Sequence, residues 1–327
     1  MLSINMPVTE AVKEITLDDI RQAAARIASI ARKTPVMTSE RFDSETGLKA
    51  FFKCENLQVG GAFKIRGAAN LILGLPTEQL KRGVVAFSSG NHGQAVAMAA
   101  QYCGVAATVV MPADAPQSKV EATRARGATI VIYDRLKDDR VAIGKRIAEE
   151  TGATLVPPFD NPRIIAGQGT AALELLEEIP GLDAVVVQIG GGGLISGSSI
   201  VAKSVNPSIR VIGAEPADAN DTFLSLAAGR RVEIPPPKTI ADGLRSPMPG
   251  ELTFPIIQRN VERVVLVDDK EIKETVKFLL MHLKILAEPS GAVPAAAAFF
   301  GKLPAGLRRV GFMISGGNVD FDLLASF

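Results

Sequence analysis

Short apolar runs alternate along the chain with longer amphipathic or Ala-rich segments. Runs of this kind are typical of buried strands, and the segments between them are long enough for helices. Strands are predicted at 50–53, 83–87, 106–111, 128–133, 153–156, 184–189, 210–214, 263–267 and 309–314. Helices are predicted at 20–30, 63–75, 95–103, 117–126, 139–151, 170–178, 195–204, 269–283 and directly after Pro289. This alternation indicates right-handed crossovers and mostly parallel sheets, so the predicted fold class is α/β.

Proline-rich segments interrupt the alternation at two places. The first is 157–162, and we expect the chain to cross between two domains there. The second is a run of three prolines at 235–237, which lies within the span 215–255. We expect this long span to form loops over a site, because its apolar residues follow neither the period of a helix nor that of a strand.

The composition excludes several classes of protein. The 327 residues carry a net charge of +1, from 36 Lys and Arg against 35 Asp and Glu, and 47% of them are apolar. This balance predicts a globular protein that acts on a small molecule, with no nucleic acid and no membrane as partner. Two cysteines and two histidines supply too few ligands for a zinc centre or a Cys/His protease site. With no disulfide framework, signal peptide or spanning segment in view, the protein is predicted to be cytoplasmic.

One lysine follows a flexible turn at the start of a predicted helix. Gly60 and Gly61 separate this helix from the strand at 50–53, so Lys64 lies at the positive end of the helix, next to Arg66. These positive influences and the apolar neighbours disfavour the ammonium form, and would lower the pKa toward the range useful for Schiff-base chemistry. The alternative interpretation is an ordinary first-turn lysine on a solvated face.

A run of four glycines, 190–193, lies between a predicted strand and a predicted helix. Successive backbone N–H groups at a helix N-terminus form a site suited to phosphate. A nicotinamide dinucleotide is an alternative ligand, because Glu215 ends the next strand where a ribose-binding carboxylate would lie. The dinucleotide fingerprint needs a third glycine, however, and Ser196 stands in that position. A glycine-rich turn without a ligand is the third alternative.

Two further polar segments follow predicted strands. Residues 88–94 follow the strand at 83–87, and Ser315 follows the last strand, at the carboxyl end where ligands of parallel sheets bind. Lys64, the glycine run and Ser315 supply an amine for an aldehyde, donors for a phosphate and a hydroxyl for a pyridine nitrogen. Pyridoxal 5'-phosphate needs these three groups, and Asn91 adds an amide for its 3-oxygen. Because a neutral serine does not hold a proton on the pyridine nitrogen, the ring is predicted to be a weaker electron sink, suited to β-elimination.

Seven segments, in order, resemble the motifs of one enzyme family. They are 53–58, 61–68, 88–94, 166–170, 190–194, 288–292 and 315–318. On these residues the chain resembles the fold type II (tryptophan synthase β-like) pyridoxal-phosphate enzymes, in the branch of serine/threonine dehydratases and serine racemases. The resemblance implies two parallel-sheet domains with the cofactor in the cleft between them. Residues 1–80 and 160–327 would form the large cofactor-binding domain and 81–159 the small substrate-side domain, in a homodimer or a higher homo-oligomer.

The resemblance also implies a role for each site residue. Lys64 is implied to be the Schiff-base lysine and the base at the substrate Cα, and Ser89 the hydroxyl that faces it across the ring in racemases. The implied cofactor-binding residues are Phe63, Lys64, Asn91, Gly190, Gly191, Gly192, Gly193, Leu194 and Ser315. The implied substrate-binding residues are Ser88, Ser89, Gly90, Asn91, His92 and Arg140. Ala62 is a departure, since the family usually has serine there.

An acidic stretch, 215–221, resembles the divalent-cation loop of this branch. The resemblance implies Mg²⁺ or Ca²⁺ bound by Glu215, Ala219 and Asp221, through carboxylate oxygens and a backbone carbonyl. A solvated acidic loop is the alternative interpretation.

The predicted function is a pyridoxal-phosphate-dependent dehydratase (ammonia-lyase) that converts L-threonine- or L-serine-type β-hydroxy-α-amino acids to 2-oxo acids and ammonia. A 3-hydroxyaspartate ammonia-lyase is one alternative, because 133–140 and 239–245 are similar to such enzymes and Arg140 or Arg245 is suited to a second carboxylate. Surface arginines are the plainer interpretation. A serine racemase with dehydratase side activity is another alternative. Two alternatives from other functional classes are a nicotinamide oxidoreductase and a catalytically inactive amino-acid-binding relative.

Overall fold

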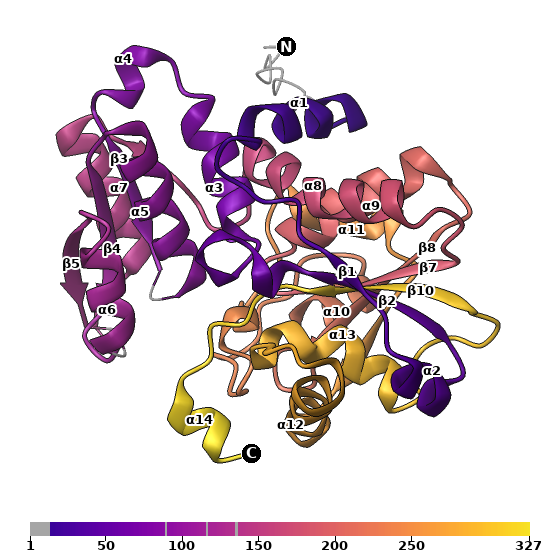
Figure 1. Ribbon diagram of the computed structural model, residues 1–327. Coiled ribbons are helices and arrows are strands. Elements are labelled where there is room, and N and C mark those ends of the chain that lie inside the picture. Colours follow the sequence, from indigo (N-terminus) through magenta and orange to yellow (C-terminus); the bar gives the residue numbers. More distant parts are fainter. Residues whose placement is uncertain (1–13, 89, 116, 135–136) are drawn as a thin grey trace, which may run out of the picture.

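Two separate β-sheets form the frame of the molecule (Figure 1). The structure is a computed structural model that describes residues 14–88, 90–115, 117–134 and 137–327. The larger sheet has the order β1 (Val36–Met37), β2 (Lys49–Cys54), β10 (Arg309–Ile314), β7 (Ala184–Gln188), β8 (Arg210–Pro216) and β9 (Arg263–Val267). All neighbours in it are parallel except β1 and β2. The last strand in the sequence therefore lies in the middle of the sheet, between β2 and β7.

The smaller sheet is entirely parallel. Its order is β5 (Thr129–Tyr133), β4 (Ala107–Pro112), β3 (Val84–Phe87) and β6 (Thr154–Leu155). All four strands fall within 81–159, the range predicted for a small domain; the division into domains itself stays a prediction. The two mostly parallel sheets confirm the predicted α/β class.

Helices cover both faces of each sheet, and Figure 1 shows α8 and α9 on one side of the larger sheet with α12 and α13 on the other. The helices from the N-terminus to the crossing between the sheets are α1 (Leu17–Ile27), α2 (Glu40–Thr46), α3 (Lys64–Leu73), α4 (Thr77–Leu80), α5 (Asn91–Cys103), α6 (Gln117–Arg124) and α7 (Arg140–Thr151). The later helices are α8 (Pro162–Glu178), α9 (Gly193–Val205), α10 (Asp221–Ala228), α11 (Thr253–Asn260), α12 (Asp269–Phe278), α13 (Pro289–Phe299) and α14 (Phe321–Ala325). Among the described residues, no helix is both long and apolar enough to cross a membrane.

Strand β7 shows why the apolar runs are continuous rather than alternating. Ala184 and Val186 pack into the core with α12 and α13, whereas Val185 and Val187 pack into the core with α8, α9 and α11. A parallel strand covered on both faces has no polar face, so every position is apolar. The prediction of strands from such runs is confirmed for this reason.

Helices α2, α4, α11 and α14 were not predicted, and α8 and α10 also depart from the predicted pattern. Helix α8 begins at Pro162 rather than at 170, because the Asn161 side chain accepts hydrogen bonds from two backbone N–H groups of the first turn and Pro162 occupies the first helical position. Helix α10 lies inside 215–255, which was predicted to form loops only. The side chain of Glu215, on the preceding strand, accepts two backbone N–H groups at the start of α10. A cap that comes from another element leaves no signal in the pattern of apolar residues along the helix.

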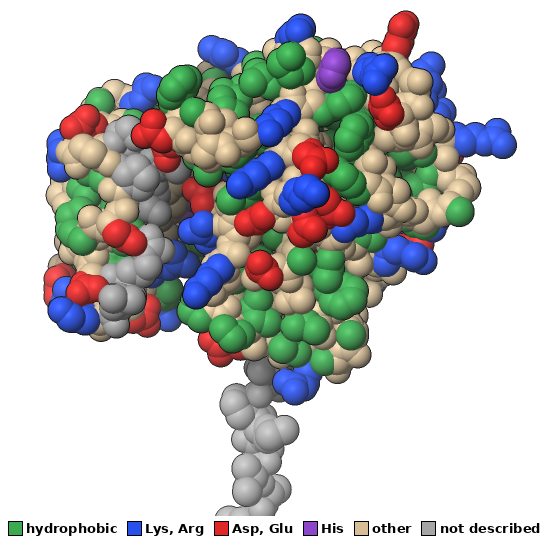
Figure 2. Space-filling view, turned by 90° about the horizontal axis from the view of Figure 1, so that it is seen from below, with side chains coloured by type: hydrophobic (Ala, Val, Ile, Leu, Met, Phe, Trp, Pro, Cys, Tyr) green, Lys and Arg blue, Asp and Glu red, His purple; other side chains and the backbone are tan. Residues whose placement is uncertain are grey.

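Charged side chains of both signs are mixed on the face of the molecule seen in Figure 2. Neither sign forms a continuous field on that face. This distribution agrees with the near-zero net charge of the chain.

Candidate active site

One cavity of about 890 Å³ collects nearly all the predicted site residues. Its size is within the range usual for sites of small molecules and cofactors. The predicted residues that line it are Phe63, Lys64, Ser88, Gly90, Asn91, His92, Arg140, Gly190, Gly191, Gly192, Gly193, Leu194 and Ser315. Ser89 lies outside the described residues. The predicted cation ligands do not line the cavity.

Lys64 is held beside the end of β10 by main-chain bonds. The Phe63 N–H donates to the Ser315 carbonyl at 2.9 Å, and Ala62 forms an antiparallel bridge with Gly316. The turn before it needs glycine, because Gly61 has a φ of +73° and a Cβ there would lie 2.3 Å from the Asn318 side chain. The predicted glycine turn at the start of the helix is therefore present, and it positions the first residue of α3.

The Lys64 amine donates to the Pro158 carbonyl at 3.1 Å and lies over the Phe63 ring. Burial lowers the pKa of Lys64 from 10.5 to about 8, although the nearby Glu288 carboxylate opposes that change. With this pKa about a tenth of the amine is uncharged at pH 7, far more than for an ordinary lysine. Burial, rather than the charge of Arg66, causes the lowered pKa, so the predicted influence of Arg66 is wrong.

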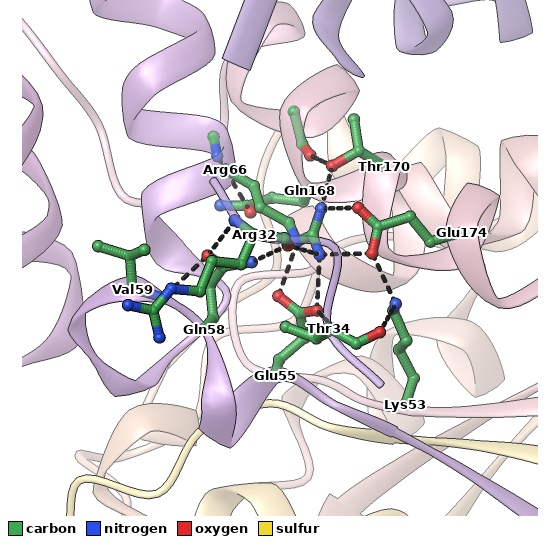
Figure 3. Close-up of polar contacts among 12 residues, drawn as sticks. Arg32, Thr34, Lys53, Glu55, Gln58, Val59, Arg66, Gln168, Thr170 and Glu174 are labelled. Atoms are coloured by element: carbon green, nitrogen blue, oxygen red, sulfur yellow. Dashed lines mark hydrogen bonds and ion pairs between the residues drawn. The ribbon is translucent and has the colours of Figure 1, made fainter. Parts of the chain in front are cut away.

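Arg66 instead belongs to a buried ionic cluster, shown in Figure 3. Its guanidinium donates to both oxygens of Glu55 at 2.7 and 2.8 Å, and to both oxygens of Glu174 at 2.7 and 2.8 Å. Lys53 donates to Glu174 and to the Thr34 carbonyl, each at 2.6 Å. Two cations and two carboxylates thus join α3 to β2 and α8, which holds the helix that begins with Lys64.

The glycine run connects β7 to α9 and packs closely against its surroundings. A Cβ at Gly191 would lie 2.2 Å from the Phe159 ring, and Gly192 has a φ of +93°. The Thr253 hydroxyl donates to the Gly191 carbonyl at 2.7 Å, which fixes the loop from outside the cavity. The loop therefore forms a side-chain-free cradle at the N-terminus of α9, suited to an anion.

Asn91 begins α5 and points toward two residues that sequence reasoning gave no role. Its amide nitrogen donates to the two oxygens of Glu288 at 2.9 and 3.0 Å, and its amide oxygen accepts from Asn318 at 2.9 Å. Glu288 directly precedes α13 and also raises the pKa of Lys64 against the effect of burial. The segment 288–292 had been recognised only as a family motif, and the contact with Asn91 joins residues far apart in the sequence.

Comparison with known proteins identifies the family. Residues 27–316 match the model of the family described as pyridoxal-phosphate dependent enzyme. The chain belongs to this family. It is 46% identical to L-threo-3-hydroxyaspartate ammonia-lyase of Pseudomonas sp., over 94% of this chain and 97% of that protein. It is 43% identical to L-threonine ammonia-lyase of Thermotoga maritima, over 95% of this chain and 77% of that protein.

A solved structure supports the same conclusion for the fold. The structure of maize serine racemase matches with a TM-score of 0.92 and 46% identity, over 95% of this chain and 96% of that one. The predicted resemblance to fold type II pyridoxal-phosphate enzymes is confirmed. The family implies pyridoxal phosphate as the cofactor of this chain.

The residues of the cavity fit this cofactor. Gly190, Gly191, Gly192 and Gly193 line the cavity without side chains, directly before and at the start of α9, where backbone N–H groups suit a phosphate. The same cavity wall carries the partly uncharged amine of Lys64 and the hydroxyl of Ser315, at the end of β10. An anion cradle, an amine and a hydroxyl are the donor set that pyridoxal phosphate requires.

His92, one of the implied substrate-binding residues, carries a buried imidazole in the first turn of α5. Its Nε2 lies 2.9 Å from the Val156 carbonyl, which only accepts, so Nε2 carries the ring proton. Burial, reinforced by the charge of Lys64, lowers the pKa of His92 to about 3, and the ring is neutral. Nδ1 has no partner among the described residues and is an acceptor. Because the imidazole has no second proton for a substrate carboxylate, only the His92 backbone N–H, in the first turn of α5, is suited to that contact.

The predicted cation ligands form a separate buried group at the start of α10. Glu215 and Asp221 are both 0% exposed, and Glu215 accepts the backbone N–H groups of Thr222 and Phe223 at 3.1 and 2.9 Å. Both oxygens of Asp221 lack a hydrogen-bond partner among the described residues. Burial raises the pKa of both carboxyls, that of Asp221 to about 7, and the charge of Asp221 adds to the effect on Glu215. The described residues contain no group of three or more His, Cys, Asp and Glu side chains around a common point.

The two candidate arginines both line the cavity. Arg140 begins α7 and lies with its guanidinium carbon 5.9 Å from the centre of the Phe87 ring. Arg245 donates to the Thr239 carbonyl through Nε at 2.8 Å and through Nη2. Neither has an ion-pair partner within the described part of the chain, so both are available to a negatively charged group.

Proposed function

We propose that the protein is a pyridoxal-phosphate-dependent ammonia-lyase that acts on L-threonine- or L-serine-type β-hydroxy-α-amino acids. One observation carries this proposal: a single cavity brings together the Lys64 amine, the glycine cradle 190–193 and the Ser315 hydroxyl. These groups come from three distant parts of the chain. A structural lysine or a ligand-free glycine turn would not explain why they meet.

The proposed cofactor contacts follow from the cavity wall. Residues 190–194 would hold the phosphate, Lys64 the aldehyde carbon, Asn91 the 3-oxygen and Ser315 the ring nitrogen, with Phe63 beside the ring. When bound, pyridoxal phosphate withdraws electrons from the amino-acid Cα and so weakens its C–H bond. The protein contributes the positions of these groups and the state of their protons.

Lys64 is the proposed base. Its pKa of about 8 leaves part of the free amine ready to accept the Cα proton near neutral pH, and Glu288 stabilises the ammonium that results. Backbone N–H groups at the start of α5, in the segment 88–92, would hold the substrate carboxylate. Loss of the β-hydroxyl as water, followed by hydrolysis of the enamine, yields a 2-oxo acid and ammonia.

A 3-hydroxyaspartate ammonia-lyase is the second candidate, and the two cavity arginines favour it. Arg140 and Arg245 are free of ion-pair partners among the described residues and face the cavity that would hold the substrate. A second substrate carboxylate would give either guanidinium a charge-assisted partner. The third candidate, racemisation of serine, depends on Ser89 as an acid opposite Lys64.

A divalent cation is also proposed, held by Glu215, Asp221 and the carbonyl of Ala219. Two buried carboxylates with raised pKa values, one of them without a partner among the described residues, support Mg²⁺ or Ca²⁺ there. A cytoplasmic location and a homodimer or higher homo-oligomer complete the proposal. The buried free thiol of Cys54 supports a reducing compartment.

The experiment that tests the function uses the purified protein loaded with pyridoxal phosphate. Ammonia release is measured with L-threonine, L-serine and the diastereomers of 3-hydroxyaspartate, and chiral chromatography of serine detects racemisation. Lys64→Ala should abolish every reaction and the borohydride-sensitive visible absorbance while leaving the melting temperature nearly unchanged. Lys81→Ala, at an exposed lysine, is the matched control and should keep full activity. Full activity in Lys64→Ala would refute the proposal.

A further inference from the structure

Thr253, the first residue of α11, is a buried threonine to which the proposed function gives no role. It is 0% exposed and does not line the cavity. Its hydroxyl donates to the Gly191 carbonyl at 2.7 Å and accepts the Gly250 N–H at 3.0 Å. The same N–H also donates to the Gly191 carbonyl at 3.4 Å. Two donors outside the cavity therefore hold this one carbonyl of the glycine run.

The direction of the Gly191 carbonyl decides the direction of the next N–H group. In a planar trans peptide the C=O and the N–H that follows it point in opposite directions. Because the Gly191 carbonyl points out of the cavity to Thr253, the Gly192 N–H points to the cavity side of the loop. Gly192 is the N-cap of α9, and N–H groups at that end have no partner within the helix. This N–H is therefore available to an anion in the cavity.

Thr253 is itself held by Asp160, which lies in the crossing between the two sheets, after β6 and before α8. The Asp160 carboxylate accepts from three successive backbone N–H groups, those of Glu251 at 2.8 Å, Leu252 at 2.9 Å and Thr253 at 3.2 Å. A negative charge is favourable at the N-terminus of a helix, so this contact fixes the first turn of α11. The position of the Thr253 hydroxyl thus depends on a carboxylate that is far away in the sequence.

We propose that Thr253 is a positioning residue that turns the Gly192 N–H toward the phosphate of the cofactor, and that Asp160 holds Thr253 in place for this role. The inference rests on the proposed function, in which residues 190–194 hold the phosphate. An N–H that is already oriented donates to the phosphate without a prior rearrangement of the loop, which favours binding. Neither Thr253 nor Asp160 lines the cavity, so the role is confined to the phosphate.

The test compares pyridoxal phosphate with pyridoxal, which lacks the phosphate. The full chain is freed of cofactor and titrated with each compound, and the borohydride-sensitive visible absorbance gives the dissociation constant. Thr253→Val keeps the shape of the side chain but has no hydroxyl proton. It should weaken binding of pyridoxal phosphate by about tenfold or more and leave binding of pyridoxal unchanged. Thr253→Ser keeps the hydroxyl and should bind both compounds as wild type does.

The matched control is Thr275→Val. Thr275 is also 0% exposed, and its hydroxyl donates to the Glu271 carbonyl at 2.8 Å within α12, away from the cavity. This variant should bind both compounds as wild type does. Asp160→Asn replaces one accepting oxygen by a donor and should show the loss seen in Thr253→Val, selective for the phosphate compound but smaller. An Asp160→Asn variant without that loss would contradict the part of the inference that concerns Asp160.

The outcomes separate this inference from the proposed function. If Thr253→Val binds pyridoxal phosphate as tightly as wild type, or loses affinity for both compounds equally, Thr253 does not act through the phosphate and the ammonia-lyase proposal still stands. Failure of wild type to bind pyridoxal phosphate would refute both. Loaded wild type that releases no ammonia from any of the substrates would refute the proposed function alone.

A measurement on wild type decides the inference if Thr253→Val does not fold. In protein labelled with ¹⁵N glycine, inorganic phosphate alone should shift the amide signal of Gly192. A Gly192 signal that does not move at saturating phosphate would overturn the inference, because the N–H would then not face the anion.

Discussion

Two buried groups of charged side chains in this molecule differ in whether their charges are compensated by partners of opposite sign. Arg66, Lys53, Glu55 and Glu174 combine two cations with two anions, and Arg66 and Lys53 are 1% and 0% exposed. Burial alone would raise the pKa of Glu55, but the charge and hydrogen bonds of Arg66 outweigh burial and hold that pKa below its ordinary value. Glu215 and Asp221 are buried as deeply but have no Lys or Arg ion-pair partner among the described residues, and the pKa of each is raised.

The difference shows how to distinguish an ionic cluster that holds the fold from one that is incomplete. In the Arg66 cluster each carboxylate oxygen accepts from a cationic side chain, so the charges are compensated within the chain. At Asp221 neither oxygen has a partner among the described residues, and a buried anion without compensation is strongly unfavourable. The first group is therefore structural, and the second is the group at which a divalent cation is proposed.

The largest effect is expected from breaking the compensated cluster. Arg66→Met should lower the free energy of unfolding by about 3–5 kcal/mol, because it leaves the carboxylates of Glu55 and Glu174 buried without their main partner. Denaturation in urea measures this change. Arg210→Met is the matched control, since it breaks an ion pair with Glu262 whose side chains are 31% and 33% exposed, and should cost at most about 1 kcal/mol. Equal losses in the two variants would contradict the structural role of the Arg66 cluster.

An intermediate effect is expected from adding a divalent cation to the Glu215 and Asp221 group. Mg²⁺ or Ca²⁺ at about 100 times its dissociation constant should stabilise wild type by about 2.7 kcal/mol over protein in chelator, because the cation binds only the folded state. Asp221→Asn should abolish this response. Asp218→Asn changes an exposed carboxylate in the same loop and should keep it. The measurement is thermal unfolding of each variant with and without chelator. If the cation stabilises Asp221→Asn as much as wild type, the cation binds elsewhere.

The smallest effect, when it is taken over a single pH unit, is a slope of stability with pH in the absence of cation. The folded-state pKa of Asp221 is raised from 3.8 to about 7, so between these values the folded protein binds more protons than the unfolded chain. Stability from this carboxyl is therefore present at low pH and lost as pH rises from about 4 to about 7, by at most about 1.4 kcal/mol per pH unit for one proton. Glu55 acts in the opposite sense, because its lowered pKa makes its contribution fall as the solution becomes more acidic.

The measurement for this slope is the difference in unfolding free energy between wild type and Asp221→Asn in chelator. As pH rises, wild type should lose stability relative to Asp221→Asn. Saturating cation should remove this dependence on pH. A flat difference in chelator would mean that Asp221 is compensated by a group other than a bound cation.

Much of the fold could be predicted because it depends on local properties. Apolar runs such as the one at 184–189 mark strands that are covered on both faces, and the Gly60–Gly61 turn follows from backbone conformations that other residues rarely adopt. Helix α10 was missed because its cap comes from Glu215, on the preceding strand. The start of α8 was missed because Pro162 was interpreted as a break, although proline suits the first turn of a helix.

The sequence by itself determined which elements form, which family the motifs resemble, and that Lys64, the glycine run and Ser315 are candidates for one site. Each of these conclusions depends on neighbours along the chain. Only the tertiary structure decided what those residues contact: Gln188 at the hydroxyl of Ser315, Glu288 at the amide of Asn91, and Arg66 between Glu55 and Glu174. The physical reason is tertiary packing: β10 inserts between β2 and β7 and so brings Ser315 to Gln188, and α3 packs on α8 and so brings Arg66 to Glu174, 108 residues away. Hydrogen-bond direction and charge compensation depend on those distant partners, so they have no local pattern from which to be inferred.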